Sequence, residues 1–202
     1  RQSLKTYQNN YQIITAKAVQ EESAWNNWGK ALQLGQETAE MVQNSPHPLS
    51  TWREADSKCN EAVKLLNSIP STTSIYHQAQ EKLVGYKNNC ANLDKRVAVE
   101  EKAINTMMGV EKLDREIQTA AQEMPYTASS LQQIVFKTNQ VINLLYQIPS
   151  GTIVSEKAET LKAAYQYNQK EISEKIENFE DCQTIPSGVC IDSTFPINLK
   201  NH

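Results

Sequence analysis

The sequence repeats itself at a constant spacing of 79 residues, and this repeat limits the possible folds more than any other feature. Shifting the chain by that spacing places Ile69-Pro70-Ser71 on Ile148-Pro149-Ser150, and no gap is needed. Other matches run along the whole chain: Leu4 with Leu83, Tyr7 with Tyr86 and Tyr165, Asn10 with Asn89 and Asn168, Glu21 with Glu100, and Pro46 with Pro125. A fixed period of this length predicts stacked copies of one supersecondary unit.

Within each copy, apolar residues recur at alternating steps of three and four. This is the 3.5-residue period of long helices that pack along a seam. Gly is scarce, at six residues, and prolines and turn residues divide the pattern into segments. We therefore expect an all-α chain of about five helices, at residues 1–44, 50–68, 74–123, 129–147 and 153–180.

The repeat unit consists of a short helix, an Ile-Pro turn and a long helix. Each short helix is expected to pack between the second half of one long helix and the first half of the next, as spectrin shares its long helices. This arrangement predicts elongated tandem three-helix bundles. The first bundle would cover residues 1–123 and the second residues 97–181, followed by a C-terminal tail at residues 182–202.

Residues 1–44 correspond to the long helix of a unit whose short helix does not precede them in this sequence. An uncovered stripe of Leu4, Tyr7, Tyr11 and Ile14 would be a sticky surface. We therefore expect that the chain begins inside a repeat of a larger protein. The alternative is a free first helix that is covered by a partner chain.

The four cysteines fall into two pairs. Cys182 and Cys190 bracket a short turn, and the sequence predicts a disulfide hairpin there. Cys59 and Cys90 lie on the stripes of neighbouring helices, but counting from the Ile-Pro turn separates them by roughly 10 Å in height. That exceeds the roughly 7 Å between Cα atoms that a disulfide spans. We therefore expect two buried free thiols at Cys59 and Cys90.

No catalytic, cofactor or metal site is expected. The sequence has no phosphate-binding loop, dinucleotide loop or zinc-peptidase motif, and His47, His77 and His202 are scattered without a Cys-x-x-Cys pair. The net charge of −3, from 20 basic and 23 acidic residues, argues against a nucleic-acid partner. No apolar run reaches the roughly 20 residues of a membrane span, so membrane contact would need segments outside this sequence.

Aromatic residues are the candidates for an interaction surface. Trp25 and Trp28 fall on the stripe of the first long helix, and Trp52 opens the short helix expected to pack beside them. Tyr and Trp are favoured anchors of protein interfaces, so the predicted surface comprises Trp25, Trp28, Trp52, Tyr7 and Tyr11. The competing interpretation is that the Trp residues fill the bundle core.

The segment from Trp52 through Leu65-Leu66 and Ile69-Pro70 to Tyr76 and Tyr86 resembles helical repeats of cyanobacterial proteins, many of them membrane-anchored or exported. The likeness covers residues 46–90 and 125–168. It implies an extracytoplasmic scaffold and no catalytic residues. The second copy departs from the pattern, with Leu131 in place of Trp and Ser155 in place of Tyr.

Two functions follow as hypotheses. The first is a non-enzymatic helical spacer or protein–protein interaction module, the soluble part of a larger membrane-associated protein, with a protein partner or a second copy as its ligand. The second is an extracytoplasmic sensory or small-ligand-binding domain with a pocket near the Trp residues. A tail disulfide favours the periplasm, and the cytoplasm remains the alternative.

Overall fold

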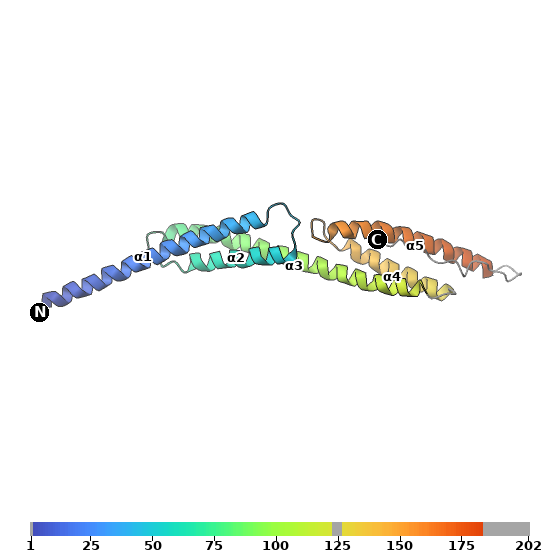
Figure 1. Cartoon of the computed structure of the whole chain (residues 1–202), viewed down its shortest axis with the longest axis horizontal. Coiled ribbons are helices and arrows are strands. Elements are labelled where there is room, and N and C mark those ends of the chain that lie inside the picture. The colour runs from blue at the N-terminus through green and yellow to red at the C-terminus, as the bar shows by residue number, and fades with distance from the viewer. Residues whose placement is uncertain (1, 123–126, 184–202) are drawn as a thin grey trace. The chain divides into compact units, whose positions relative to one another are not determined.

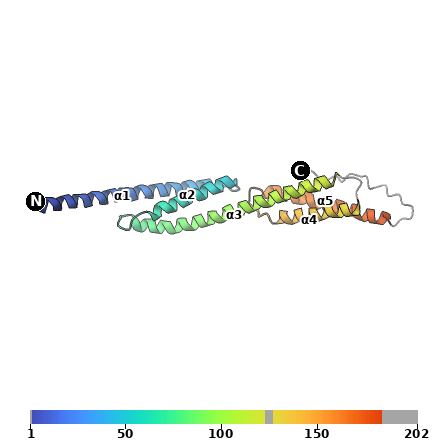
Figure 2. The same cartoon turned by 90° about the horizontal axis from the view of Figure 1, so that it is seen from below.

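The computed structural model describes residues 2–122 and 127–183, except for the side chains of residues 2, 128 and 178–183. It contains five helices and, in this part of the chain, no strand (Figures 1 and 2): α1 (Gln2–Met41), α2 (Leu49–Asn67), α3 (Tyr76–Ala120), α4 (Ala128–Tyr146) and α5 (Ser155–Gln183). Each helix end lies within three residues of its expected position. The predicted all-α fold is therefore confirmed.

The chain divides into two compact units, residues 1–98 and residues 99–202. In unit 1, α1 and α2 pack with the first part of α3, and both views show the three helices side by side (Figures 1 and 2). In unit 2, the second part of α3 packs with α4 and α5. The chain therefore forms tandem three-helix bundles that share one long helix, as the repeat predicts.

The two cores use equivalent positions of the repeat. Many residues 79 apart are buried in both units, and these pairs include Ala24 with Ala103, Ala31 with Val110, Ala62 with Val141, Leu66 with Leu145, Ile69 with Ile148, and Ala79 with Ala158. The helices bury these positions because a 3.5-residue period keeps one apolar seam facing its neighbours. The sequence repeat is therefore also a repeat of packing.

One ion pair recurs at the same spacing. Lys58 of α2 contacts Glu37 of α1 at 2.6 Å, and Lys137 of α4 contacts Glu116 of α3 at 2.6 Å. The hydrogen bond from each lysine holds the pKa of its glutamate carboxyl below the usual value. These side chains are half-buried, and ion pairs that solvent still reaches add little stability. Their main consequence is to favour one register of the short helix against the long helix.

A glutamate on each long helix caps the turn that leads into the next one. Glu21 accepts hydrogen bonds from the backbone N–H of Ser74, at 2.9 Å, and from its hydroxyl, at 2.9 Å. Glu100, which is fully buried, accepts a hydrogen bond from the backbone N–H of Ile153 at 3.1 Å. These amides lie just before α3 and α5, where a helix leaves its first N–H groups without internal partners. Glu21 and Glu100, the two polar residues within the apolar stripes, therefore stabilise the turns that follow Ile-Pro.

The prediction of free thiols at Cys59 and Cys90 was wrong, because the two residues form a disulfide with a Cα–Cα distance of 5.6 Å. The expected separation assumed that α2 ends and α3 begins at the same height along the bundle axis. Cys59 lies eight residues before the end of α2, and Cys90 lies fourteen residues after the start of α3. Since the two residues meet, α3 must begin about 9 Å beyond the end of α2, at about 1.5 Å per residue.

The connection between α2 and α3 makes this offset possible. Consecutive turns lead into α3, with the N–H of Thr73 bonded to the C=O of Pro70 and the N–H of Tyr76 bonded to the C=O of Thr73. The disulfide has no counterpart in unit 2, where Thr138 and Gln169 hold the equivalent positions. The predicted pair Cys182 and Cys190 lies outside the part of the chain whose side chains are described.

We predict that Glu100→Ala lowers the free energy of unfolding of unit 2 by about 1–3 kcal/mol, because the amide of Ile153 loses its acceptor inside the bundle. Glu100→Gln keeps a carbonyl oxygen at the same place and should lose less. Urea unfolding followed by circular dichroism measures both changes. A Glu100→Ala protein as stable as the parent chain would contradict the capping role.

Candidate functional site

The N-terminal part of α1 presents an apolar surface that no other described segment covers. Every residue from Ser3 to Val19 is exposed, and Figures 1 and 2 show this blue end of α1 with no helix beside it. The stripe positions stay apolar, with exposed fractions of 64% for Leu4, 73% for Tyr7, 71% for Tyr11 and 67% for Ile14. We call these four residues, together with Ala18, the open stripe.

The same stripe is covered where it recurs in α3. Leu83 is 4% exposed, Cys90 5% and Leu93 8%, and Tyr86 is half-buried. These residues occupy the positions of Leu4, Tyr11, Ile14 and Tyr7 one repeat later. The open stripe is therefore a packing face of the repeat that no described segment covers, and both Tyr7 and Tyr11 are exposed on it.

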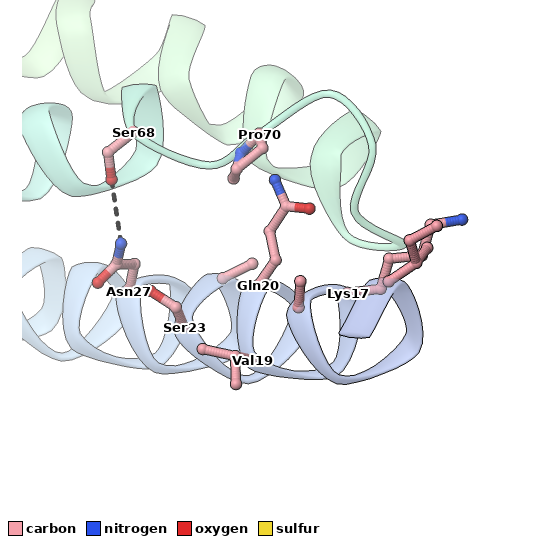
Figure 3. Close-up of a pocket in the computed structure, with 10 residues that line it drawn as sticks. Lys17, Val19, Gln20, Ser23, Asn27, Ser68 and Pro70 are labelled. Carbon is pink, nitrogen blue, oxygen red and sulfur yellow. Dashed lines mark hydrogen bonds between the residues drawn. The ribbon is translucent and has the colours of Figure 1, made fainter. Parts of the chain in front are cut away.

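A groove of about 620 Å³ lies where α1 enters the bundle of unit 1. It runs between α1 and the Ile-Pro turn, and Figure 3 shows the side chain of Gln20 reaching toward Pro70. At one end, the amide of Asn27 donates a hydrogen bond to the hydroxyl of Ser68 at 3.0 Å (Figure 3). Lys17 and Val19 also line it, but none of the five open-stripe residues does, so the groove and the stripe are separate surfaces of α1.

The three tryptophans do not form one cluster, which corrects the expectation that Trp52 lies near Trp25 and Trp28. Trp25 is 52% exposed, and Trp28 packs against the core of Ala24, Ala31 and Leu34. Trp52 is buried at the other end of the bundle, beside Met41 and Val42. The helices α1 and α2 are antiparallel, so the start of α2 lies about 20 Å along α1 from Trp28, at about 1.5 Å per residue.

Trp52 instead borders a separate cleft of about 530 Å³. The guanidinium of Arg96 lies over its ring at 4.9 Å, and His47 meets it edge-on at 5.6 Å. Both partners come from unit 1, so the ring already has aromatic and cationic contacts within the bundle. The cleft is bordered by exposed residues such as Asn89 and Asn92, which leaves it open to solvent.

The cleft exists because α1 has small residues where unit 2 has larger ones. Gly35, Thr38 and Ala39 line it, and their equivalents are Asp114, Ile117 and Gln118. Tyr86 lies against Gly35, where an added Cβ would collide with the hydroxyl oxygen of the tyrosine. Aligning the two copies could have revealed this difference from the sequence.

The tyrosine at the equivalent position of unit 2 has a different neighbour. There Tyr165 donates a hydrogen bond to the carboxylate of Asp114, which replaces Gly35. Burial, together with this bond and the charge of Asp114, raises the pKa of Tyr165 far above its usual value. Burial also raises the pKa of Tyr86. Both hydroxyls therefore stay protonated, and both tyrosines serve the packing of their bundles.

Among the residues whose side chains are described, no group of three His, Cys, Asp or Glu could hold a metal ion. No described helix is long and apolar enough to cross a membrane. No protein-family model, curated protein or solved structure matches this chain. The resemblance to cyanobacterial helical repeats therefore stays a prediction.

We predict that Gly35→Ala destabilises unit 1 by about 1–3 kcal/mol, because the new methyl group must displace Tyr86 from a packed position. Gly29→Ala on the same helix is the matched control, since a Cβ there meets nothing within 4 Å. Gly29→Ala should stabilise the chain by up to about 1 kcal/mol through helix propensity. Urea unfolding measures both variants, and equal stabilisation of the two would contradict the close packing of Tyr86 on Gly35.

Proposed function

We propose that this chain is a non-enzymatic helical interaction module that binds a protein partner through the open stripe of α1. The exposure of Leu4, Tyr7, Tyr11 and Ile14, between 64% and 73%, carries the proposal. Contiguous exposed apolar surface of this kind marks interaction sites. Tyrosine is also among the residues that contribute most to protein interfaces.

The pattern of the stripe favours a helical partner. Apolar side chains at steps of three and four form a seam whose side chains fit between those of a facing helix. One repeat later, the equivalent face of α3, with Leu83, Cys90 and Leu93, is buried against α1 and α2. A helix that packs along the stripe would therefore form an interface of a kind that the fold already contains.

The charge of this region argues against two other classes of partner. Between residues 2 and 20, Lys5 and Lys17 are the charged residues. A nucleic-acid surface needs clustered basic residues to neutralise phosphates, and a helix that lies on an anionic membrane usually has a polar face rich in Lys and Arg. The weakly charged face of α1 suits a protein partner better.

We also propose an extracytoplasmic location, as part of a larger membrane-associated protein. The disulfide between Cys59 and Cys90 supports the location, because such bonds persist in oxidising compartments and are rare in the cytosol. The membrane association rests on the resemblance of the Trp52–Tyr86 segment to exported and anchored repeat proteins.

A photo-crosslinking residue placed at Tyr7 or Tyr11 tests the interaction in the native cell. Asn9 is the matched control, because it is exposed on the opposite face of α1. We expect a defined protein adduct from Tyr7 and Tyr11, no adduct from Asn9, and loss of the adduct on Ile14→Asp. Equal labelling from both faces, or none from the stripe, would overturn the proposed function.

A further inference from the structure

The open stripe, on which the proposed function rests, repeats the face that α3 presents to its own bundle partners. We propose that the occupant of the stripe is a helical hairpin of this same repeat, equivalent to residues 24–67. The partner is therefore a protein that contains this repeat.

Most positions of the two faces match in residue type as well as in spacing. Leu4 corresponds to Leu83, Tyr7 to Tyr86, Asn10 to Asn89, and Ile14 to Leu93. In α3 this face is covered by α2 and by the C-terminal part of α1. A hairpin with the side chains of residues 24–67 would therefore find nearly the same surface on α1.

Polar positions at the end of the segment also match. Lys17 occupies the position of Arg96, whose guanidinium lies over the ring of Trp52. A lysine can make the same contact with an aromatic face, so Lys17 would cover the equivalent aromatic residue of the docked hairpin. Glu21, four residues later, caps the turn before α3 as Glu100 caps the turn before α5.

A second copy of this chain has no described hairpin free to occupy the stripe. Residues 24–67 already cover α3, and α4 already covers α5. The repeat spacing allows such a hairpin to be joined to α1 in a test protein, because residue 80 is equivalent to residue 1. A hairpin that ends at the equivalent of Ala79 would continue into α1 with no insertion and in helical register.

One position of the stripe restricts the sequence of the occupant. Tyr11 stands where α3 has Cys90, the partner of Cys59 in the disulfide. Tyrosine cannot form that bond, and its ring occupies more space than a cysteine. The occupant should therefore have a small residue other than cysteine opposite Tyr11, as unit 2 has Thr138 opposite Gln169.

A fusion protein tests this assignment. A second copy of residues 24–79 is placed directly before Arg1 of the full chain, and the chain carries Tyr11→Cys. If the added hairpin docks in register, its copy of Cys59 lies opposite position 11, and the two should form a disulfide that peptide mapping by mass spectrometry identifies. Asn9→Cys in the same fusion is the matched control, because position 9 faces away from the hairpin.

Hydrogen exchange gives a second readout that needs no engineered cysteine. In the fusion, the amides of residues 3–19 should exchange at least about tenfold more slowly than in the parent chain, because docking suppresses local opening of the helix. Ile14→Asp should remove that protection. Cross-linking at position 9 as efficient as at position 11, or an added segment that leaves residues 3–19 unprotected, would overturn the inference.

These outcomes are separate from those of the proposed function. Suppose that Tyr7 and Tyr11 cross-link to a protein that lacks this repeat. The proposed function as an interaction module would then stand, but the inference that the partner is a hairpin of this repeat would be wrong. Concentration-dependent dimers of the parent chain that Ile14→Asp abolishes would also reject it, in favour of a second copy. Suppose instead that the hairpin docks in the fusion protein but no cross-linked adduct forms in the cell. The stripe and the hairpin would then be shown to fit each other, but the proposal that the stripe binds a separate protein would be wrong.

Discussion

The apolar seam of each long helix is longer than the short helix that packs on it, and the rest of the architecture depends on this mismatch. α3 has 45 residues, whereas α2 and α4 have 19 each. A single hairpin therefore cannot cover α3, and the helix buries its first part in unit 1 and its second part in unit 2. α1 is nearly as long, with 40 residues, but has a described hairpin on its C-terminal part alone. The open stripe lies on the remaining length of α1.

Packing along such a seam requires a fixed register, and the chain uses polar and covalent contacts to set it. Glu21 and Glu100 bind the Ile-Pro turns, and the pairs of Lys58 with Glu37 and Lys137 with Glu116 join the helices. Unit 1 adds the disulfide, which closes a span of 31 residues and should stabilise the bundle by about 3–4 kcal/mol. Unit 2 relies on larger buried residues, such as Val110 and Val141 in place of alanine.

The sequence predicted the helices, the shared long helix and the unpartnered stripe, because periodicity and prolines report these features directly. It did not predict the disulfide, since the height of Cys90 against Cys59 depends on the path of the turn between their helices. The distance of Trp52 from Trp28 follows from the antiparallel arrangement of α1 and α2, and the wrong expectation had placed the start of α2 beside Trp28. The capping role of Glu100 was visible as an unexplained polar position in both copies.

The central claim is that residues 79 apart are structurally equivalent, and moving the disulfide from unit 1 to unit 2 tests it most directly. Thr138→Cys combined with Gln169→Cys places cysteines at the equivalents of Cys59 and Cys90. The account predicts that the two thiols oxidise to a disulfide and that its reduction lowers the urea midpoint of unit 2. Thr138→Cys with Lys170→Cys is the control, one residue out of register. If both engineered thiols of the first variant stay free and react with an alkylating agent in the folded protein, the equivalence of the two repeats is contradicted.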